Sequence, residues 1–104
     1  MSKDKIRKIV KKYIEVLKKE GFPLEAVYIF GSQAKGKSHF GSDIDVAIIS
    51  PKLRENWDET ETWLWRKTRG VHSLIEPVGY APEDFNETDP LVSEIKRTGI
   101  KIKL

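Results

Sequence analysis

The sequence predicts one α/β domain that spans residues 1–104. Two observations predict this class. Segments with apolar residues at helical spacing alternate with short, continuous apolar runs typical of buried strands, and glycines and prolines separate them. A length of 104 residues supports one domain with a modest core. The chain contains no Cys, which excludes disulfide scaffolds, thiolate zinc sites and cysteine nucleophiles.

The first predicted helix begins at Ser2 or Asp4, either of which can cap its free N–H groups, and ends at Gly21. Its apolar residues recur every three or four positions and form one stripe: Ile6, Ile9, Val10, Tyr13, Ile14 and Leu17. Residues 1–20 hold eight Lys or Arg against three Asp or Glu, so the net charge of +3 originates here. A basic helix face can attract nucleic acid, but it is more often only solvated, and we expect no nucleic-acid partner.

Two apolar runs, residues 26–30 and 44–49, predict buried strands. Gly31 and Ser32 end the first strand, a short helical turn follows, and residues 35–42 form a loop. Neither run is long enough to cross a bilayer. The basic N-terminus lacks the apolar segment of a signal peptide, so we expect a cytoplasmic protein with no membrane partner.

The second half of the chain predicts a helix, a third strand and a last helix. Residues 55–68 carry acids early and bases late, as the helix dipole favours. Residues 71–80 form the third strand, in which Pro77 indicates an edge position or a bend. The last helix follows Asp89 and ends at Gly99, and a short terminal strand or docked tail completes the chain.

Gly31 and Ser32 follow the first strand and open into the helical turn. Glycine lets the backbone approach a ligand closely, the start of a helix presents free N–H groups, and serine adds a hydroxyl. This combination can cradle a phosphate, although a Gly-Ser pair after a strand is by itself most often only a turn. Its interpretation therefore depends on the residues that accompany it.

Asp43 and Asp45 lie two residues apart at the start of the second strand, which places both carboxylates on one face of that strand. Two like charges beside an apolar run repel each other, so the pKa of one should rise unless a cation compensates. Mg²⁺ prefers oxygen ligands of this kind. The alternative is a solvated pair that caps the preceding loop through Ser42, and the Asp-Ile-Asp motif alone does not decide between the two.

Together, the stretch Gly31-Ser32-Gln33-Ala34-Lys35-Gly36 and the stretch Ser42-Asp43-Ile44-Asp45-Val46 resemble the nucleotidyltransferases of the DNA polymerase β superfamily. The short chain is similar to the minimal nucleotidyltransferases, which include antitoxins of the MntA type. The resemblance extends to residues 75–77, 82–85 and 95–99. It implies the polymerase β-like nucleotidyltransferase fold, a small mixed sheet flanked by helices.

The resemblance also implies roles for individual residues. It assigns binding of the nucleoside triphosphate, with ATP favoured, to four of them: Gly31, Ser32, Lys35 and Ser42. Asp43 and Asp45 would ligate two Mg²⁺ ions and serve catalysis. Glu76, the only acid inside the third predicted strand, would be the third catalytic carboxylate and metal ligand; the alternative is an exposed strand residue.

The chain departs from the family pattern at Gln33. Many members have Arg at this position, and Lys35 or Lys37 could replace the phosphate-binding charge that Gln33 lacks. His39 lies in the same loop and could touch phosphate, but a loop histidine is more often only solvated.

The resemblance implies a Mg²⁺-dependent nucleotidyltransferase that moves AMP from ATP to a hydroxyl group. Minimal nucleotidyltransferases commonly act beside a small helical HEPN-type protein, as antitoxin with toxin, and some adenylylate that partner. We therefore expect a protein adenylyltransferase whose acceptor is a HEPN-type toxin. The alternative is an antitoxin that keeps the fold and neutralises its partner by binding alone. Both homo-oligomers and hetero-oligomers stay open.

Overall fold

The structure of the protein is a computed structural model that describes residues 1–36 and 42–104. Within these residues, four strands form one sheet in the order β3-β2-β1-β4. Their bounds are β1 Ala26–Phe30, β2 Ile44–Ile49, β3 Ile75–Tyr80 and β4 Ile100–Lys101. β2 runs parallel to β3 and antiparallel to β1, and β4 pairs antiparallel with β1, so the sheet is mixed as predicted.

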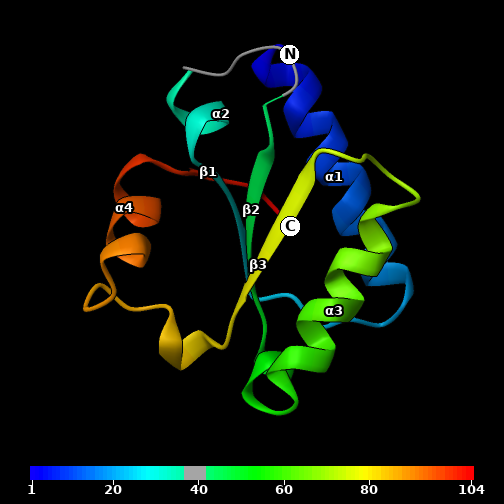
Figure 1. Ribbon diagram of the computed structural model, residues 1–104, viewed down its shortest axis with the longest axis vertical. Helices are drawn as coiled ribbons and strands as arrows, with labels where there is room; N and C mark the ends of the chain where they lie inside the picture. The colour runs from blue at the N-terminus through cyan, green and yellow to red at the C-terminus, as the bar shows by residue number, and fades with distance from the viewer. Residues whose placement is uncertain (37–41) are drawn as a thin grey trace.

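Helices cover both faces of this sheet (Figure 1). α1 (Lys3–Lys19) and α3 (Trp57–Thr68) lie on one face, and α4 (Pro90–Thr98) lies on the other. Each face has its own apolar core. The core under α1 and α3 includes Val10, Leu17, Ile29, Val46, Leu64 and Ile75. The core under α4 consists of Ala47, Ile49, Phe85, Val92 and Ile95.

Three short elements connect the larger ones: the helix α2 (Ser32–Lys35) and the 3-10 turns η1 (Pro51–Arg54) and η2 (Pro82–Asp84). α2 follows β1 directly, so it lies at the end of the sheet where β2 begins (Figure 1). In the described part of the chain, no helix combines the length and the apolar character that a bilayer span requires.

The predicted helix ends are confirmed where a capping side chain marks them. The Ser2 hydroxyl accepts a hydrogen bond from the backbone N–H of Lys5 (3.2 Å) and caps α1. The Asp89 carboxylate accepts one from the backbone N–H of Leu91 (2.9 Å) and caps α4. Gly21, which follows α1, has a φ of 76°, a conformation that glycine adopts without steric cost.

The third strand begins at Ile75, four residues later than predicted. The backbone N–H groups of Val71 and His72 donate to the carbonyl of Thr68 (2.9 and 3.0 Å), and the Nδ1 atom of His72 accepts from the N–H of Leu74 (3.1 Å). These bonds form a turn after α3. The turn uses the backbone N–H groups that would otherwise pair with a neighbouring strand. The apolar residues at 71 and 74 therefore pack as turn residues and not as part of the sheet.

β3 is an edge strand, as Pro77 indicated, and its outer edge is protected. Pro77 has no N–H to offer, the N–H of Gly79 donates to Oε2 of Glu61 (2.9 Å), and the carbonyl of Gly79 accepts from Nε1 of Trp57 (3.2 Å). Both partners belong to α3. α3 therefore holds β3, and with it Glu76, in a defined position beside β2.

Candidate active site

The predicted carboxylates meet at the end of the sheet where β2 and β3 begin. The two strands are parallel, and their register places Asp45 directly opposite Glu76. Residues in register on neighbouring strands point to the same face, so both carboxylates lie on the face that α4 partly covers. Asp43 precedes β2 by one residue and is exposed. The structure thus brings together three acids that are separated by up to 33 residues in the chain.

The electrostatics of these acids show mutual repulsion. Partial burial raises the pKa of Asp45, and the nearby charge of Asp43 raises it further. The pKa of Glu76 rises to about 7, first through a side-chain hydrogen bond with Asp43, then through burial and the charges of Asp43 and Asp45. The Glu76 carboxyl therefore binds a proton more readily than an isolated glutamate does. A pKa rise at this motif is what the sequence predicted for an uncompensated pair.

Gly31 is required by the packing of Asp45. Its backbone has φ 73° and ψ −152°, a region that only glycine adopts readily. A Cβ atom on Gly31 would lie 2.3 Å from Oδ2 of Asp45, which is far inside contact distance. Because glycine has no side chain, there is room for this carboxylate. This contact is a structural reason for glycine at position 31, and the sequence alone did not show it.

Ser32 begins α2 immediately after Gly31 and is partly exposed at the same end of the sheet. Ser42 is partly buried, and its backbone carbonyl accepts a hydrogen bond from Nε2 of Gln33 (3.1 Å). Gly31, Ser32 and Ser42 therefore lie beside the carboxylates. Their assignment to nucleotide binding stays a prediction.

Lys35, the fourth residue assigned to nucleotide binding, is already paired. Its Nζ atom contacts Oε1 of Glu94 on α4, and this hydrogen bond lowers the pKa of Glu94. Lys35 would have to leave Glu94 to contact a phosphate. Glu94 was not predicted as a site residue, because only the docking of α4 brings it to residue 35. The two other candidate phosphate contacts, Lys37 and His39, lie outside the described residues.

The donor set at this end of the sheet suits a hard divalent cation. Three carboxylates supply only oxygen ligands, and their repulsion is the energetic term that a bound Mg²⁺ would remove. Among residues 1–36 and 42–104, however, no three Asp, Glu, His or Cys side chains are arranged around one ion position. The hydrogen bond between Asp43 and Glu76 must therefore open before both can act as ligands.

A groove of about 720 Å³ lies elsewhere, between the C-terminal end of α1 and α3. Its lining includes Phe22, Lys52, Trp63 and Arg66, with the rings of Phe22 and Trp63 stacked 5.1 Å apart. None of the predicted site residues lines it. The size of this groove therefore does not indicate the site; the chemistry of the carboxylates does.

Comparison with known protein families matches residues 5–102 to the family described as Polymerase beta, Nucleotidyltransferase. A comparison with curated proteins finds no significant match. Similar solved structures include a protein from Sulfolobus solfataricus described as a candidate nucleotidyltransferase. It is 23% identical with a TM-score of 0.62, and the match covers 96% of this chain and 79% of that one.

Two further similar structures are toxin-antitoxin complexes. One, determined with AMP-PNP, is 22% identical with a TM-score of 0.65, covering 89% of this chain and 71% of that one. The other is a mutant of the MntA-HpeT toxin-antitoxin, 20% identical with a TM-score of 0.63, covering 99% and 73%. At these identities the neighbours show the fold, whereas the family match covers nearly the whole chain. The chain belongs to the polymerase β nucleotidyltransferase family.

Proposed function

We propose that the protein is a Mg²⁺-dependent adenylyltransferase that moves AMP from ATP to a hydroxyl on a partner protein, a HEPN-type toxin, and so acts as a cytoplasmic antitoxin. The proposal treats residues 1–104 as one catalytic domain. One observation carries it: Asp45 and Glu76 are paired in register with Asp43 beside them, and Gly31 leaves the space that Asp45 occupies. Three carboxylates held together against their own repulsion are typical of a functional site.

Asp43, Asp45 and Glu76 are the residues that would hold Mg²⁺. When bound, the cation would neutralise the triphosphate and stabilise the charge that develops on the attacking and leaving oxygens. Ser32, at the start of α2, is placed to donate its hydroxyl to a phosphate oxygen. Lys35, once released from Glu94, would add a positive charge to the same group.

In this proposal Glu76 accepts the proton of the attacking hydroxyl. What supports this role is its place in register with Asp45, on the strand beside the other two proposed metal ligands. The acceptor oxygen would bond to the α-phosphorus as the bond to the pyrophosphate oxygen breaks. The proton would pass to the Glu76 carboxylate, and pyrophosphate would leave.

The structural neighbours support the choice of nucleotide and partner. One toxin-antitoxin neighbour was determined with AMP-PNP, an ATP analogue. The name of the MntA-HpeT mutant specifies two aspartate-to-glutamate changes two positions apart, which is the spacing of Asp43 and Asp45. An antitoxin that transfers AMP to its toxin is consistent with both.

A second candidate is an antitoxin that neutralises its toxin by contact alone. The observation that favours it is the pairing of Lys35 with Glu94, because this pairing occupies the ammonium group that the first candidate assigns to the triphosphate. Gln33, where many relatives have Arg, adds no charge to compensate.

The proposal is tested by incubating the protein with α-labelled ATP, Mg²⁺ and a HEPN-type protein encoded beside it. Label should pass to that protein, and Glu76→Gln should slow transfer by roughly 100-fold while ATP affinity changes little, because a general base acts mainly in the transition state. Glu83→Gln, an exposed acid at the opposite end of the sheet, is the matched control and should transfer normally. Neutralisation of the partner without any label transfer would instead support the contact-only antitoxin.

A further inference from the structure

Gln33 occupies an unusual position for a residue next to a phosphate cradle. It lies in α2, one residue after Ser32, and only 2% of its surface is exposed. Its Nε2 atom donates a hydrogen bond to the backbone carbonyl of Ser42 (3.1 Å). A side chain this buried and uncharged is poorly suited to bind a phosphate directly.

The bond from Gln33 joins the two halves of the candidate site. Gln33 follows the Gly31-Ser32 cradle, and Ser42 immediately precedes Asp43. A single side-chain bond therefore ties the cradle to the start of the metal-binding strand across nine positions of chain. Because the amide is buried, water does not compete for the bond, and it is stronger than an exposed one.

The other atom of the same amide shows that this bond has a cost. Among the described residues, Oε1 of Gln33 has no hydrogen-bond partner although it is buried. An unsatisfied buried acceptor is destabilising, and an apolar side chain of similar length would fill the space without that penalty.

We propose that Gln33 is a positioning residue that holds the backbone next to Asp43 at a fixed spacing from the phosphate cradle, the spacing at which metal and triphosphate bind together. This inference rests on the proposed function, because it concerns how the same site is held. Gln33 itself contacts neither ligand.

The test replaces the amide with an apolar side chain of similar length, Gln33→Met. We expect the affinity for Mn²⁺, measured by electron paramagnetic resonance in the presence of AMP-PNP, to fall roughly three- to tenfold, the range of one hydrogen bond. The matched control is Thr68→Val, which removes another buried side-chain bond to a carbonyl, from Oγ1 to Trp65 (2.7 Å), on α3 away from the site. This control should lower stability and leave Mn²⁺ affinity unchanged.

Equal Mn²⁺ affinity in Gln33→Met and the parent would overturn the inference, as would an equal loss in both variants, which would indicate an effect of stability alone. If the parent itself bound no Mn²⁺, both the proposed function and this role would fail. If the parent bound Mn²⁺ and Gln33→Met bound it with the same affinity, the proposed function would stand and the positioning role of Gln33 alone would fail.

A measurement on the parent protein keeps the inference testable if Gln33→Met does not fold. The side-chain amide protons of Gln33 should exchange slowly with solvent in nuclear magnetic resonance spectra, and their signals should shift when Mg²⁺ and AMP-PNP are added. Exchange at the rate of a free amide, or signals that do not respond to Mg²⁺, would contradict the assignment.

Discussion

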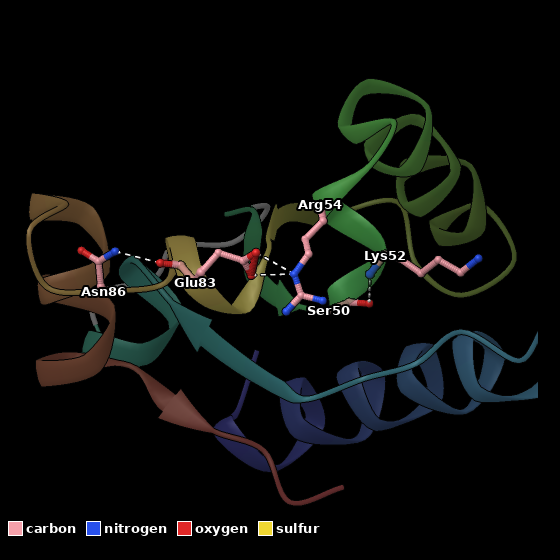
Figure 2. Close-up of polar contacts among 5 residues, drawn as sticks. All are labelled: Ser50, Lys52, Arg54, Glu83 and Asn86. Carbon is pink, nitrogen blue, oxygen red and sulfur yellow. Dashed lines mark hydrogen bonds and ion pairs between the residues drawn. The ribbon is translucent and has the colours of Figure 1, made fainter.

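The carboxylates at the two ends of the sheet have opposite surroundings. At the end where β2 and β3 finish, the Glu83 carboxylate accepts two hydrogen bonds from Nε of Arg54, at 3.0 and 2.6 Å (Figure 2). This pair links η1 to η2, and it lowers the pKa of Glu83. At the end where the strands begin, Asp43, Asp45 and Glu76 face one another, and no described Lys or Arg forms an ion pair with them.

This difference separates a carboxylate that is paired with a cation of the protein from three carboxylates that we propose bind a ligand. An exposed ion pair such as Arg54 with Glu83 adds little to stability, but the opposite charges attract and both groups stay hydrated. At the other end, burial and the charge of Asp43 raise the pKa of Asp45, and the hydrogen bond with Asp43, burial and both neighbouring charges raise the pKa of Glu76, so these ionised acids weaken the fold in the absence of a cation. Groups kept together at such a cost indicate a binding or catalytic site.

Among the changes that test this difference between the two ends of the sheet, replacing Asp43 and Asp45 together by Asn should have the largest effect on metal binding. The change removes two proposed ligands and their repulsion but keeps the side-chain size. Binding of Mn²⁺ with ATP, measured by calorimetry, should weaken by roughly 100-fold or more. The unfolding free energy at pH 7 should be no lower than that of the parent, since a partly buried, repelled charge is lost. Parent-like binding would remove the basis for the metal assignment.

Gly31→Ala should have the next largest effect. The new Cβ would meet Oδ2 of Asp45 at 2.3 Å, so this carboxylate must move, and the backbone conformation adds about 1–3 kcal/mol of strain. We expect Mn²⁺-ATP affinity to fall by roughly tenfold or more, together with stability. Gly21→Ala is the matched control, because Gly21 also has a positive φ (76°) but has open space around its Cβ position. It should lose stability in chemical denaturation and keep its affinity.

The smallest expected effect is on the pH dependence of stability in chelator-treated buffer. The pKa of Glu76 is raised from 4.5 to about 7, so the folded state holds this proton more tightly than the unfolded state between these values. The unfolding free energy should therefore fall as the pH rises from about 4.5 to 7. Glu83 has the opposite sign: its lowered pKa contributes stability at neutral pH that is lost as the pH falls below about 4.5.

Denaturation curves recorded across this range, for the parent and for Glu76→Gln, test this prediction. The Gln variant should lose the decrease between pH 4.5 and 7, and Mg²⁺ should reduce the decrease in the parent. A parent whose stability rises steadily through this window would show that the pKa of Glu76 is not raised in the folded protein.

Much of the fold follows from local pattern. The bounds of the strands at 26–30 and 44–49 were predicted correctly because each is a continuous apolar run closed by turn residues. The edge position of β3 follows from Pro77, which lacks the N–H that an inner strand needs. The start of β3 was predicted four residues early, because a side-chain acceptor, Nδ1 of His72, completes a turn that apolar pattern alone does not reveal.

The sequence by itself determined the family to which this chain belongs: the Gly31-Ser32 turn and the spacing of Asp43 and Asp45 are local features that together resemble the nucleotidyltransferases, and the family match confirms the resemblance. Only the tertiary structure decided which groups meet. The parallel register places Glu76 opposite Asp45, α4 brings Glu94 to Lys35, and α2 folds Gln33 onto Ser42. Each of these contacts depends on how strands and helices pack across long stretches of chain. The periodicity of a segment reports the face that it buries and not the segment that it meets.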